Sequence, residues 1–466
     1  MAERDHHIRT QDAEPIGLIP RILFSRVELW VVLLLLMVGT TLAVCFGAAV
    51  LEAERKNEGL GFVSRTALAV AEIPLTAKSL LHAGSRFRVW STDRYKSQPT
   101  GWSFPAGPMT GSRGYLLLSR FDGSDNREKL ELVAMPSMRT VYSWPVDGSE
   151  LLQRTMHRRS FEPISWEDGY FDPVHPVLEE NGDLIVKKFF AAIRVDPCGK
   201  PLWTLQDAVY HHSIEPDANG NLWLPSTLNR PSVAPISEKF QDNRITEITS
   251  SGKLLLARSV AQILLRHGYA NWLFSIPYSD PMHLNDIQPV LADGPYWKKG
   301  DLFLSLRNLS TIMLYRPKTD QILWFKRGPW IAQHDVDILD DHRISVYDND
   351  AQARTSGTPF IASSSQVMVY DFATGKISLP LQRAMNDNGV RTLTEGLFTR
   401  LPDGSALIQD PNEGRLLIFR ADGAIAAQYL NRAKDGWLYH LGWSRYIDQA
   451  SGDAVLTNLR KVRCNA

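Results

Sequence analysis

The stretch GDLFLSLRNLSTIMLYRPKTDQILW, from Gly300 to Trp324, decides the fold class. It reads as a turn, an apolar strand, a gap, a second strand, another turn and a third strand that ends in Trp. The same order occurs in NGDLIVKKFFAAIRVDPCGKPLW, from Asn181 to Trp203. A strand-rich unit that recurs at this length indicates a repeat architecture.

Further copies of this unit bring the number to about six. One begins at Asp403 (DGSALIQDPNEGRLLIFRADGAIAAQYL) and one at His342 (HRISVYDND, then SQVMVYDFATGKISLPL), while looser copies begin at Gly114 and Asn219. Small antiparallel sheets that bury their faces against neighbours around a channel form a β-propeller. The sequence therefore predicts an all-β, six-bladed β-propeller. The copies are irregularly spaced, so we expect insertions, of which Ala261 to Asp280 is predicted to be partly helical.

An apolar segment precedes the repeats. Residues Leu29 to Leu51, LWVVLLLLMVGTTLAVCFGAAVL, include no charged side chain, and about 20 apolar residues suffice to cross a bilayer. The run is longer than a cleaved signal peptide and starts farther from the N-terminus, so we expect an uncleaved transmembrane signal anchor. Arginines before it favour a cytoplasmic N-terminus. The predicted organisation is a cytoplasmic tail (1–28), a transmembrane helix (29–51), a juxtamembrane connector (52–111) and the propeller (112–466).

Composition excludes several classes of protein. Lys plus Arg and Asp plus Glu are equal at 51 each, which gives no support to nucleic-acid binding. The three cysteines form no CxxC pair, which excludes a zinc ribbon and a thioredoxin-type motif.

Three histidines stand at comparable places in three predicted blades. They are His212, His283 and His334, each shortly before a turn and the next apolar strand, and Arg307 follows such a strand. We expect all four side chains to point into the channel. Three imidazoles could bind zinc or another transition metal. The arginine favours an oxyanion instead, because guanidinium donors suit tetrahedral oxyanions and a cation repels a metal.

These same residues carry a family resemblance. The run from Ser305 to Asp350, with HHSIEPDANGNLW and HLNDI upstream, resembles the arylsulfotransferase family, bacterial enzymes that move sulfate between phenols without a nucleotide donor. The resemblance covers roughly Val209 to Leu430 and implies ping-pong transfer without a cofactor or a bound metal.

The resemblance also implies residue roles. His334 would be the nucleophile that forms a sulfohistidine, and Arg307 would hold the sulfonate oxygens. His283 and Asn285 would hydrogen-bond the sulfuryl group and the phenolic oxygen, with His283 as acid and base. His212 would fill the remaining histidine place, although the pair His211-His212 leaves that choice open.

Location and partners follow by the same implication. The propeller would lie on the periplasmic side of the cytoplasmic membrane, held by one helix, with an aryl sulfate and a hydroxyl compound as substrates. A membrane-complex partner or a homo-oligomer is compatible with this arrangement. In that compartment Cys198 and Cys464 could form a disulfide or remain separate, while Cys45 lies in the membrane segment.

Two other functions remain open at this point. A propeller of this fold could be a catalytically silent scaffold subunit of a membrane or envelope polysaccharide assembly, since propellers host unrelated functions. A hydrolase could use the same histidine with water as the acceptor.

Overall fold

The computed structural model describes residues 27–54, 60–64, 66–67, 69–71, 88–89, 92–146, 151, 173–188, 191–228, 231–233, 240–274, 279–352 and 360–464. The chain divides into two compact units, Met1–Ser85 and Arg86–Ala466. Each unit is described by itself.

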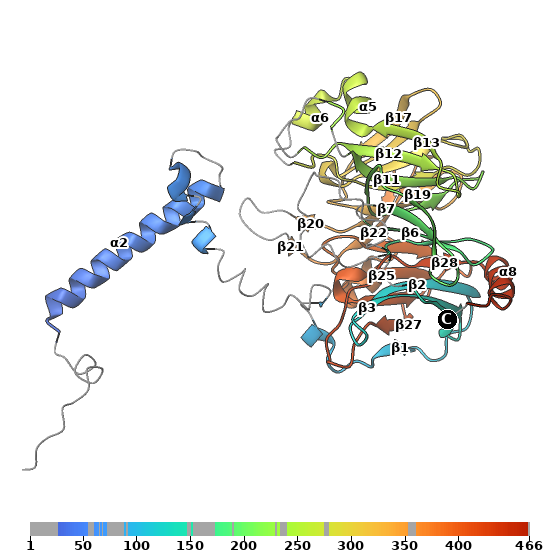
Figure 1. Ribbon diagram of the computed structural model, residues 1–466, viewed down its shortest axis with the longest axis horizontal. Coiled ribbons are helices and arrows are strands. Elements are labelled where there is room, and N and C mark those ends of the chain that lie inside the picture. Colours follow the sequence, from blue (N-terminus) through green and yellow to red (C-terminus); the bar gives the residue numbers. More distant parts are fainter. Residues whose placement is uncertain are drawn as a thin grey trace, which may run out of the picture. The chain divides into compact units, whose positions relative to one another are not determined.

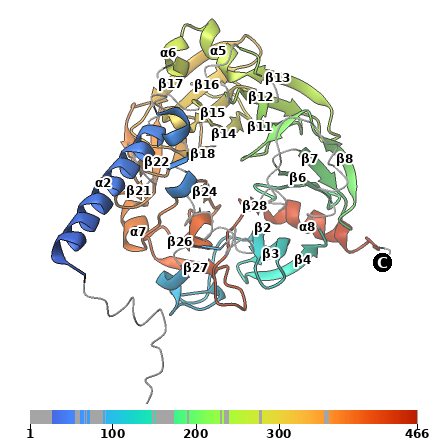
Figure 2. The same cartoon turned by 60° about the vertical axis from the view of Figure 1, so that its left-hand side comes forward.

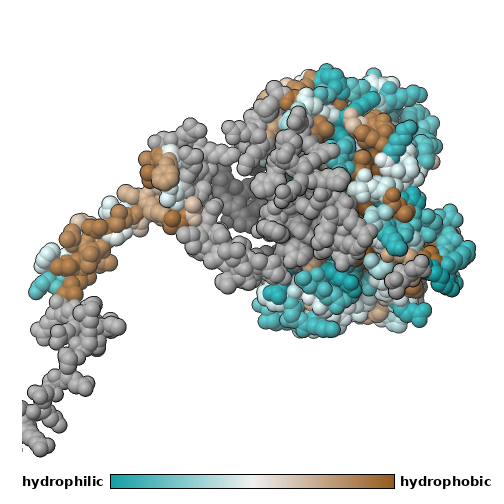
Figure 3. Space-filling model, in the orientation of Figure 1, coloured by the Kyte–Doolittle hydropathy of each residue, from teal (hydrophilic) through white to brown (hydrophobic). Residues whose placement is uncertain are grey.

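The first unit contains the helix α2 (Leu29–Glu54). Its segment Leu29–Glu52 is long and apolar enough to cross a membrane, and none of its most apolar stretch is buried against protein. Leu29, Leu35 and Leu42 are among its exposed side chains, and apolar residues run along its length (Figure 3). An unburied apolar helix of this length is compatible with single-pass membrane anchoring.

The second unit is a six-bladed β-propeller whose sheets are all antiparallel (Figures 1 and 2). Blade 1 is β28 (Arg445–Ile447), β2 (Gly114–Asp122), β3 (Arg127–Met135) and β4 (Arg139–Trp144), and blade 2 is β5 (Val177–Leu178), β6 (Leu184–Lys188), β7 (Ala191–Val195) and β8 (Pro201–Leu205). Blade 3 is β10 (Glu215–Pro216), β11 (Leu222–Leu228), β12 (Asn243–Ile248) and β13 (Leu254–Ser259), with β9 (Ala208–Tyr210) also paired to β11. Blade 4 is β14 (Leu284–Pro289), β15 (Leu302–Leu306), β16 (Thr311–Arg316) and β17 (Gln321–Arg327).

The remaining strands complete the ring and one insertion. Blade 5 is β18 (His334–Ile338), β19 (Arg343–Asp348), β22 (Gln366–Asp371) and β23 (Ile377–Ser378). Blade 6 is β24 (Leu397–Arg400), β25 (Ala406–Asp410), β26 (Arg415–Phe419) and β27 (Ile425–Leu430), extended by β1 (Gly101–Ser103). A two-stranded sheet, β20 (Ala351–Gln352) and β21 (Phe360–Ile361), is inserted in blade 5. The short 3-10 helices are η2 (Thr92–Tyr95), η4 (Arg307–Leu309) and η5 (Pro411–Glu413).

The core lies between the blades. Six clusters of buried apolar side chains each join two neighbouring sheets, and together they pass once around the ring. Ile193 of blade 2 and Leu132 of blade 1 share one cluster, and Val346 of blade 5 and Phe303 of blade 4 share another. Each sheet thus buries both faces, which explains why the repeated strands are rich in apolar residues.

The innermost strand of each blade is the one that the repeat pattern omits. In Figure 2, β14, β18, β24 and β28 surround the axis, with β17, β13 and β8 outside. The sequence repeat that begins at Gly300 therefore contains the second, third and fourth strands of blade 4, and Arg307 follows the second strand rather than the first. The sequence repeat begins one strand too late in each blade because strands such as β14 (LNDIQP) and β18 (HDVDI) face the channel and carry polar residues.

The ring is closed by both ends of the second unit. Strand β28 comes from near the C-terminus and forms the inner edge of blade 1, where Tyr115 of β2 is paired with Ile447. Strand β1 precedes blade 1 in the chain and pairs with β27 of blade 6, with Gly101 opposite Leu430. This strand falls within the range 52–111 that we assigned to the connector.

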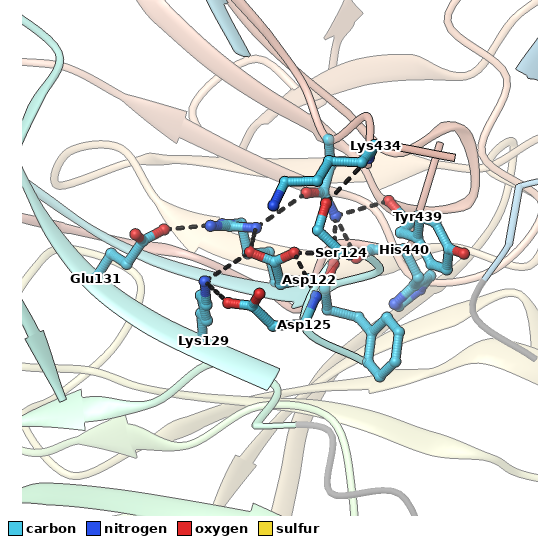
Figure 4. Close-up of polar contacts among 11 residues, drawn as sticks. Asp122, Ser124, Asp125, Lys129, Glu131, Lys434, Tyr439 and His440 are labelled. Carbon is cyan, nitrogen blue, oxygen red and sulfur yellow. Dashed lines mark hydrogen bonds and ion pairs between the residues drawn. The ribbon is translucent and has the colours of Figure 1, made fainter. Parts of the chain in front are cut away.

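Hydrogen bonds hold the segment 431–441, which leads to β28 (Figure 4). The side-chain amide of Asn431 donates to the carbonyl oxygens of Phe121, Tyr439 and His440, at 2.8, 3.0 and 3.1 Å. Beside it Arg120 donates to Asp122 at 3.0 Å. The bonds of Asn431 tie the segment 431–441 to β2 and so fix the position of the main chain at His440.

Two predictions about the outer parts of the propeller can be compared with the structure. In the predicted insertion, α5 (Val260–Arg266) and α6 (Ala270–Phe274) are helical, as expected. Elsewhere in the described residues of the propeller, α7 (Gln382–Asp387) and α8 (Gln449–Leu459) are helical. Cys198 and Cys464 form a disulfide, which joins the β7–β8 turn to the segment after α8. The choice that the sequence left open is thus settled in favour of pairing.

Candidate functional site

Five polar side chains from three neighbouring blades meet where the inner strands begin. His211 and His212 precede β10, His283 directly precedes β14, and His334 is the first residue of β18. Arg307 begins η4, the turn between β15 and β16. We call these five residues the channel cluster. Residues far apart in sequence meet here because successive inner strands start at the same end of the channel.

His212 lies at the centre of the imidazoles. Its ring centroid is 5.0 Å from that of His283 and 5.5 Å from that of His334. The ring of His211 is 6.2 Å from that of His283, and its Nε2 contacts Thr227 Oγ1 at 3.2 Å. Of the ambiguous pair, His212 is therefore the member beside His334, and His211 supports it through an Nδ1 to Nδ1 contact of 2.9 Å.

Two of these histidines have left-handed backbones. The φ angle is 58° at His212 and 51° at His283. Residues other than glycine adopt this conformation at a cost of about 1–3 kcal/mol, and such residues concentrate at functional sites. The left-handed backbone at these two residues orients each imidazole toward the cluster, and this conformational free energy is its cost.

The tautomer of His334 follows from its neighbours. The side-chain nitrogen of Asn349 donates to the carbonyl oxygens of Thr392 and Glu395, at 2.7 and 2.8 Å, so its oxygen Oδ1 faces His334 Nδ1 at 2.8 Å. Nδ1 must then carry the proton and donate it, which leaves the lone pair on Nε2. The main-chain N–H of Glu395 points at this Nε2 at 3.2 Å.

Arg307 is held by the loop that carries His283. Its main-chain N–H donates to His283 O at 3.1 Å, and its side chain donates to Asn308 Oδ1 at 3.0 Å and Leu393 O at 3.4 Å. Among the described residues it has no carboxylate in ion-pair contact. Its remaining N–H groups are thus available to an anion.

His283 is oriented by a carboxylate three residues before it. Asp280 accepts from the main-chain N–H of His283 at 2.9 Å and lies 2.6 Å from its Nδ1. Burial would raise the pKa of Asp280, but the hydrogen bond and the charge of His283 outweigh it and lower that pKa. A carboxylate on Nδ1 leaves Nε2 of His283 free to exchange a proton with a ligand.

Asn285 lies behind His334. It is fully buried, and its side-chain nitrogen donates to Gln333 O at 2.8 Å. Its oxygen Oδ1 has no hydrogen-bond partner in the part of the chain that the structure describes. In this geometry the amide braces the residue that precedes His334.

Three imidazoles of the cluster, those of His211, His212 and His334, are kept neutral. Burial lowers the pKa of His334 far below its ordinary value, and the positive charge of Arg307 lowers it further. Burial likewise lowers the pKa of His211 to about 3 and that of His212 well below its usual range. Lys187, almost fully buried in β6, adds to the effect at His211 and His212. A neutral imidazole retains the lone pair that a nucleophile needs.

A buried tryptophan adjoins the histidines. The ring of Trp443 lies 6.2 Å from that of His212, 6.1 Å from that of His334 and 5.5 Å from that of His175. Near His175, Arg445 of blade 1 donates to Glu215 of blade 3 at 3.2 Å, and Glu215 lies 3.0 Å from His175 of blade 2. These contacts join the inner strands of three blades and so stabilise the channel wall.

Sequence reasoning missed the residues that orient the cluster. Asp280, Asn349, Glu395 and Trp443 were not selected, although Asp280 and Asn349 stand close to selected residues in the chain. Spacing alone did not reveal Asp280, because its contact with His283 depends on the left-handed turn between them. Glu395 lies 61 residues from His334, and Trp443 belongs to the closing segment.

The zinc alternative gains no support. In the described ranges, the group of His, Cys, Asp and Glu whose ligand atoms come within 4.8 Å of one another is Asp340, Asp341 and His342, on a surface turn outside the channel cluster. The positive charge of Arg307 also lowers the pKa of His334, and a fixed cation this close to an imidazole repels a bound metal ion.

Comparisons with solved structures find matches of low identity and low TM-score. A Bacteroides caccae protein of unknown function has 12% identity and a TM-score of 0.44, with 72% of this chain and 99% of that chain covered. A virginiamycin B lyase from Staphylococcus aureus has 12% identity and a TM-score of 0.34, with 55% and 70% covered. No curated protein matches the chain. Likenesses at this level carry no argument about function.

A family model gives the decisive comparison. The model described as Arylsulfotransferase (ASST) matches residues 191–432, which is more than half of the 466-residue chain. The matched range contains blades 3, 4 and 5 entirely and strands β24 to β27 of blade 6, and it includes all five residues of the channel cluster. The resemblance inferred from the sequence is confirmed, and the chain belongs to the arylsulfotransferase family.

Proposed function

We propose that this protein transfers a sulfuryl group from an aryl sulfate to a phenolic or other hydroxyl acceptor through a sulfohistidine at His334. The observation that carries the proposal is the fixed tautomer of His334, which is neutral, protonated on Nδ1 and within electrostatic reach of Arg307 and His283. Family membership supports the reaction class.

In the first step Nε2 of His334 attacks the sulfur of the donor. The N–S bond forms, the S–O bond to the aryl group breaks, and the aryl oxygen leaves with the electron pair. Arg307 holds the sulfonate oxygens in a transition state where charge stabilisation matters most. Because the attack consumes the lone pair of Nε2, the N–H of Glu395 becomes free to donate to a sulfuryl oxygen.

His283 acts as general acid in the first step and as general base in the second. Protonated on both nitrogens, it donates from Nε2 to the leaving aryl oxygen, while Asp280 stabilises its positive charge. In the second step neutral His283 takes the proton of the acceptor hydroxyl, whose oxygen attacks sulfur as the N–S bond breaks. His212 packs between His283 and His334 and, in this proposal, donates to the transferred group.

We further propose that α2 anchors the protein in the cytoplasmic membrane with the propeller on the periplasmic side. The disulfide between Cys198 and Cys464 supports an oxidising compartment for the propeller, since disulfides are rare in the cytosol. The domain boundaries predicted from the sequence remain part of this proposal.

Purified protein tests the function directly. Incubated with 4-nitrophenyl sulfate and a phenol, it is expected to release nitrophenol and to form the sulfated phenol in equal amounts. Nitrophenol release that continues without any hydroxyl acceptor would identify a hydrolase. A folded protein that shows neither turnover nor a sulfated form would instead be a catalytically silent scaffold.

The pH dependence of donor cleavage tests the neutral state of His334. Since its pKa lies well below the ordinary 6.5, the imidazole stays neutral as the pH falls through that value. An ordinary imidazole would be only about one-tenth neutral at about pH 5.5. We expect the single-turnover rate of nitrophenol release to fall less than about twofold between about pH 7.5 and 5.5. A rate that halves near pH 6.5 would contradict this assignment.

A further inference from the structure

A polar cavity lies in the propeller away from the inner strands and the channel cluster. Its volume is about 780 Å³, and its walls come from η2, β1, β27 and the end of α7 with the residues that follow it. This volume is within the range of pockets that enclose small organic ligands. The lining residues that matter most are Arg94, Tyr95, Phe104, Asn388, Arg391 and Arg415.

The cavity is rich in guanidinium groups. Arg415 is buried and pairs with Asp410 at 3.1 Å, and Arg94 lies 3.8 Å from Glu413. Arg391 donates from Nε to Ser363 O at 2.9 Å, and the described part of the chain offers it no carboxylate partner. One guanidinium at the wall is thus uncompensated and can bind an oxyanion.

Two buried polar atoms at this wall are unsatisfied. Among the described residues, neither the hydroxyl of Tyr95 nor Nε of Arg415 has a hydrogen-bond partner, although both residues are only 2% exposed. The guanidinium carbon of Arg415 lies 5.0 Å from the centroid of the Tyr95 ring. An unsatisfied buried donor is energetically unfavourable, so these two atoms mark this wall as poor in polar partners.

The other lining groups suit a hydroxyl-rich ligand. Phe104 is 36% exposed and stands between Pro105 and Ser103 at the cavity, which gives an apolar face beside the amides of Gln98 and Asn388. Gly389 permits the close approach of Arg94, because a Cβ at this position would lie 2.0 Å from Arg94 Nη2. Amides, guanidinium groups and an apolar face together match a saccharide that carries negative charge.

We propose that this cavity binds an anionic oligosaccharide, with a carboxylate or sulfate ester on Arg391 and Arg94 and a sugar ring against Phe104. Binding here is independent of sulfuryl transfer, because none of these residues belongs to the channel cluster.

Calorimetric titration tests the proposal with three trisaccharides: maltotriose, sulfated maltotriose and trigalacturonate. The titrations use the full chain carrying Arg307→Gln, so that the channel cluster does not contribute to anion binding. Both anionic sugars are expected to bind at least about tenfold more tightly than maltotriose, since charge-assisted hydrogen bonds are stronger than those between neutral groups. A preference for only one of them identifies the anionic group.

Substitutions then locate the site. Arg391→Gln is expected to weaken anionic binding about tenfold, and Phe104→Ala to weaken binding of the same sugars. Arg400→Gln is the matched control, because Arg400 ends β24 in blade 6, has an exposed side chain and does not line the cavity. Equal binding of maltotriose, an unchanged dissociation constant in Arg391→Gln, or no binding at all would overturn the proposal.

Discussion

Replacing His334 by alanine is expected to reduce 4-nitrophenyl sulfate turnover by about 10⁴-fold or more, because it removes the atom that accepts the sulfuryl group. His334 is fully buried, and its Nδ1 lies 2.8 Å from Asn349 Oδ1. The positive charge of Arg307 lowers the pKa of His334. The measurement is kcat/KM for nitrophenol release by the purified variant.

The matched control for this experiment is His342→Ala. His342 lies in the same blade, between β18 and β19, but its side chain is on the surface and contacts Asp341. We expect this variant to keep turnover within about twofold of the unsubstituted protein. If His334→Ala folds, retains its thermal midpoint and still transfers the sulfuryl group, the nucleophile has been wrongly identified.

Replacing Arg307 by lysine is expected to lower kcat/KM by about 10²-fold, although the positive charge is kept. Lysine is a point charge, whereas the guanidinium holds two oxygens in fixed geometry and is itself fixed by Asn308 and Leu393. Arg307→Gln removes the charge as well, and its loss should be larger, about 10³-fold.

Arg327→Lys is the control for this substitution. Arg327 ends β17 in the same blade and is exposed. Its replacement should leave kcat/KM unchanged. Should Arg307→Lys behave like this control, the sulfonate group would have to be held by other residues, and Lys187 would be the next one to test.

The sequence predicted the second and third strands of the blades better than the innermost ones. Strands such as β15 and β16 are buried on both faces and therefore form apolar runs that repeat visibly. An inner strand such as β18 (HDVDI) faces the channel and carries charged residues, so it has no such pattern. The closing strand β28 has three residues and no counterpart at the start of the repeat, so its pairing with β2 was not predicted.

The candidate site shows the same division. The histidines and Arg307 could be found because they recur at comparable positions of successive blades and match a family pattern. Asp280 and Asn349 could not, since their contacts with His283 and His334 depend on turn geometry and on amide orientation. The disulfide was left open for a similar reason. Cys198 and Cys464 are 266 residues apart in sequence, and only the ring brings their Cα atoms to 5.5 Å.

The proposed reaction depends on a covalent sulfohistidine at His334. Its most direct test is intact-mass measurement of the protein mixed rapidly with 4-nitrophenyl sulfate in the absence of an acceptor, followed by peptide mapping. We predict a gain of one SO₃ group, located on the peptide that contains His334 and lost when a phenol is added. An active protein that gains no mass, or that carries the group on another residue, would contradict the account.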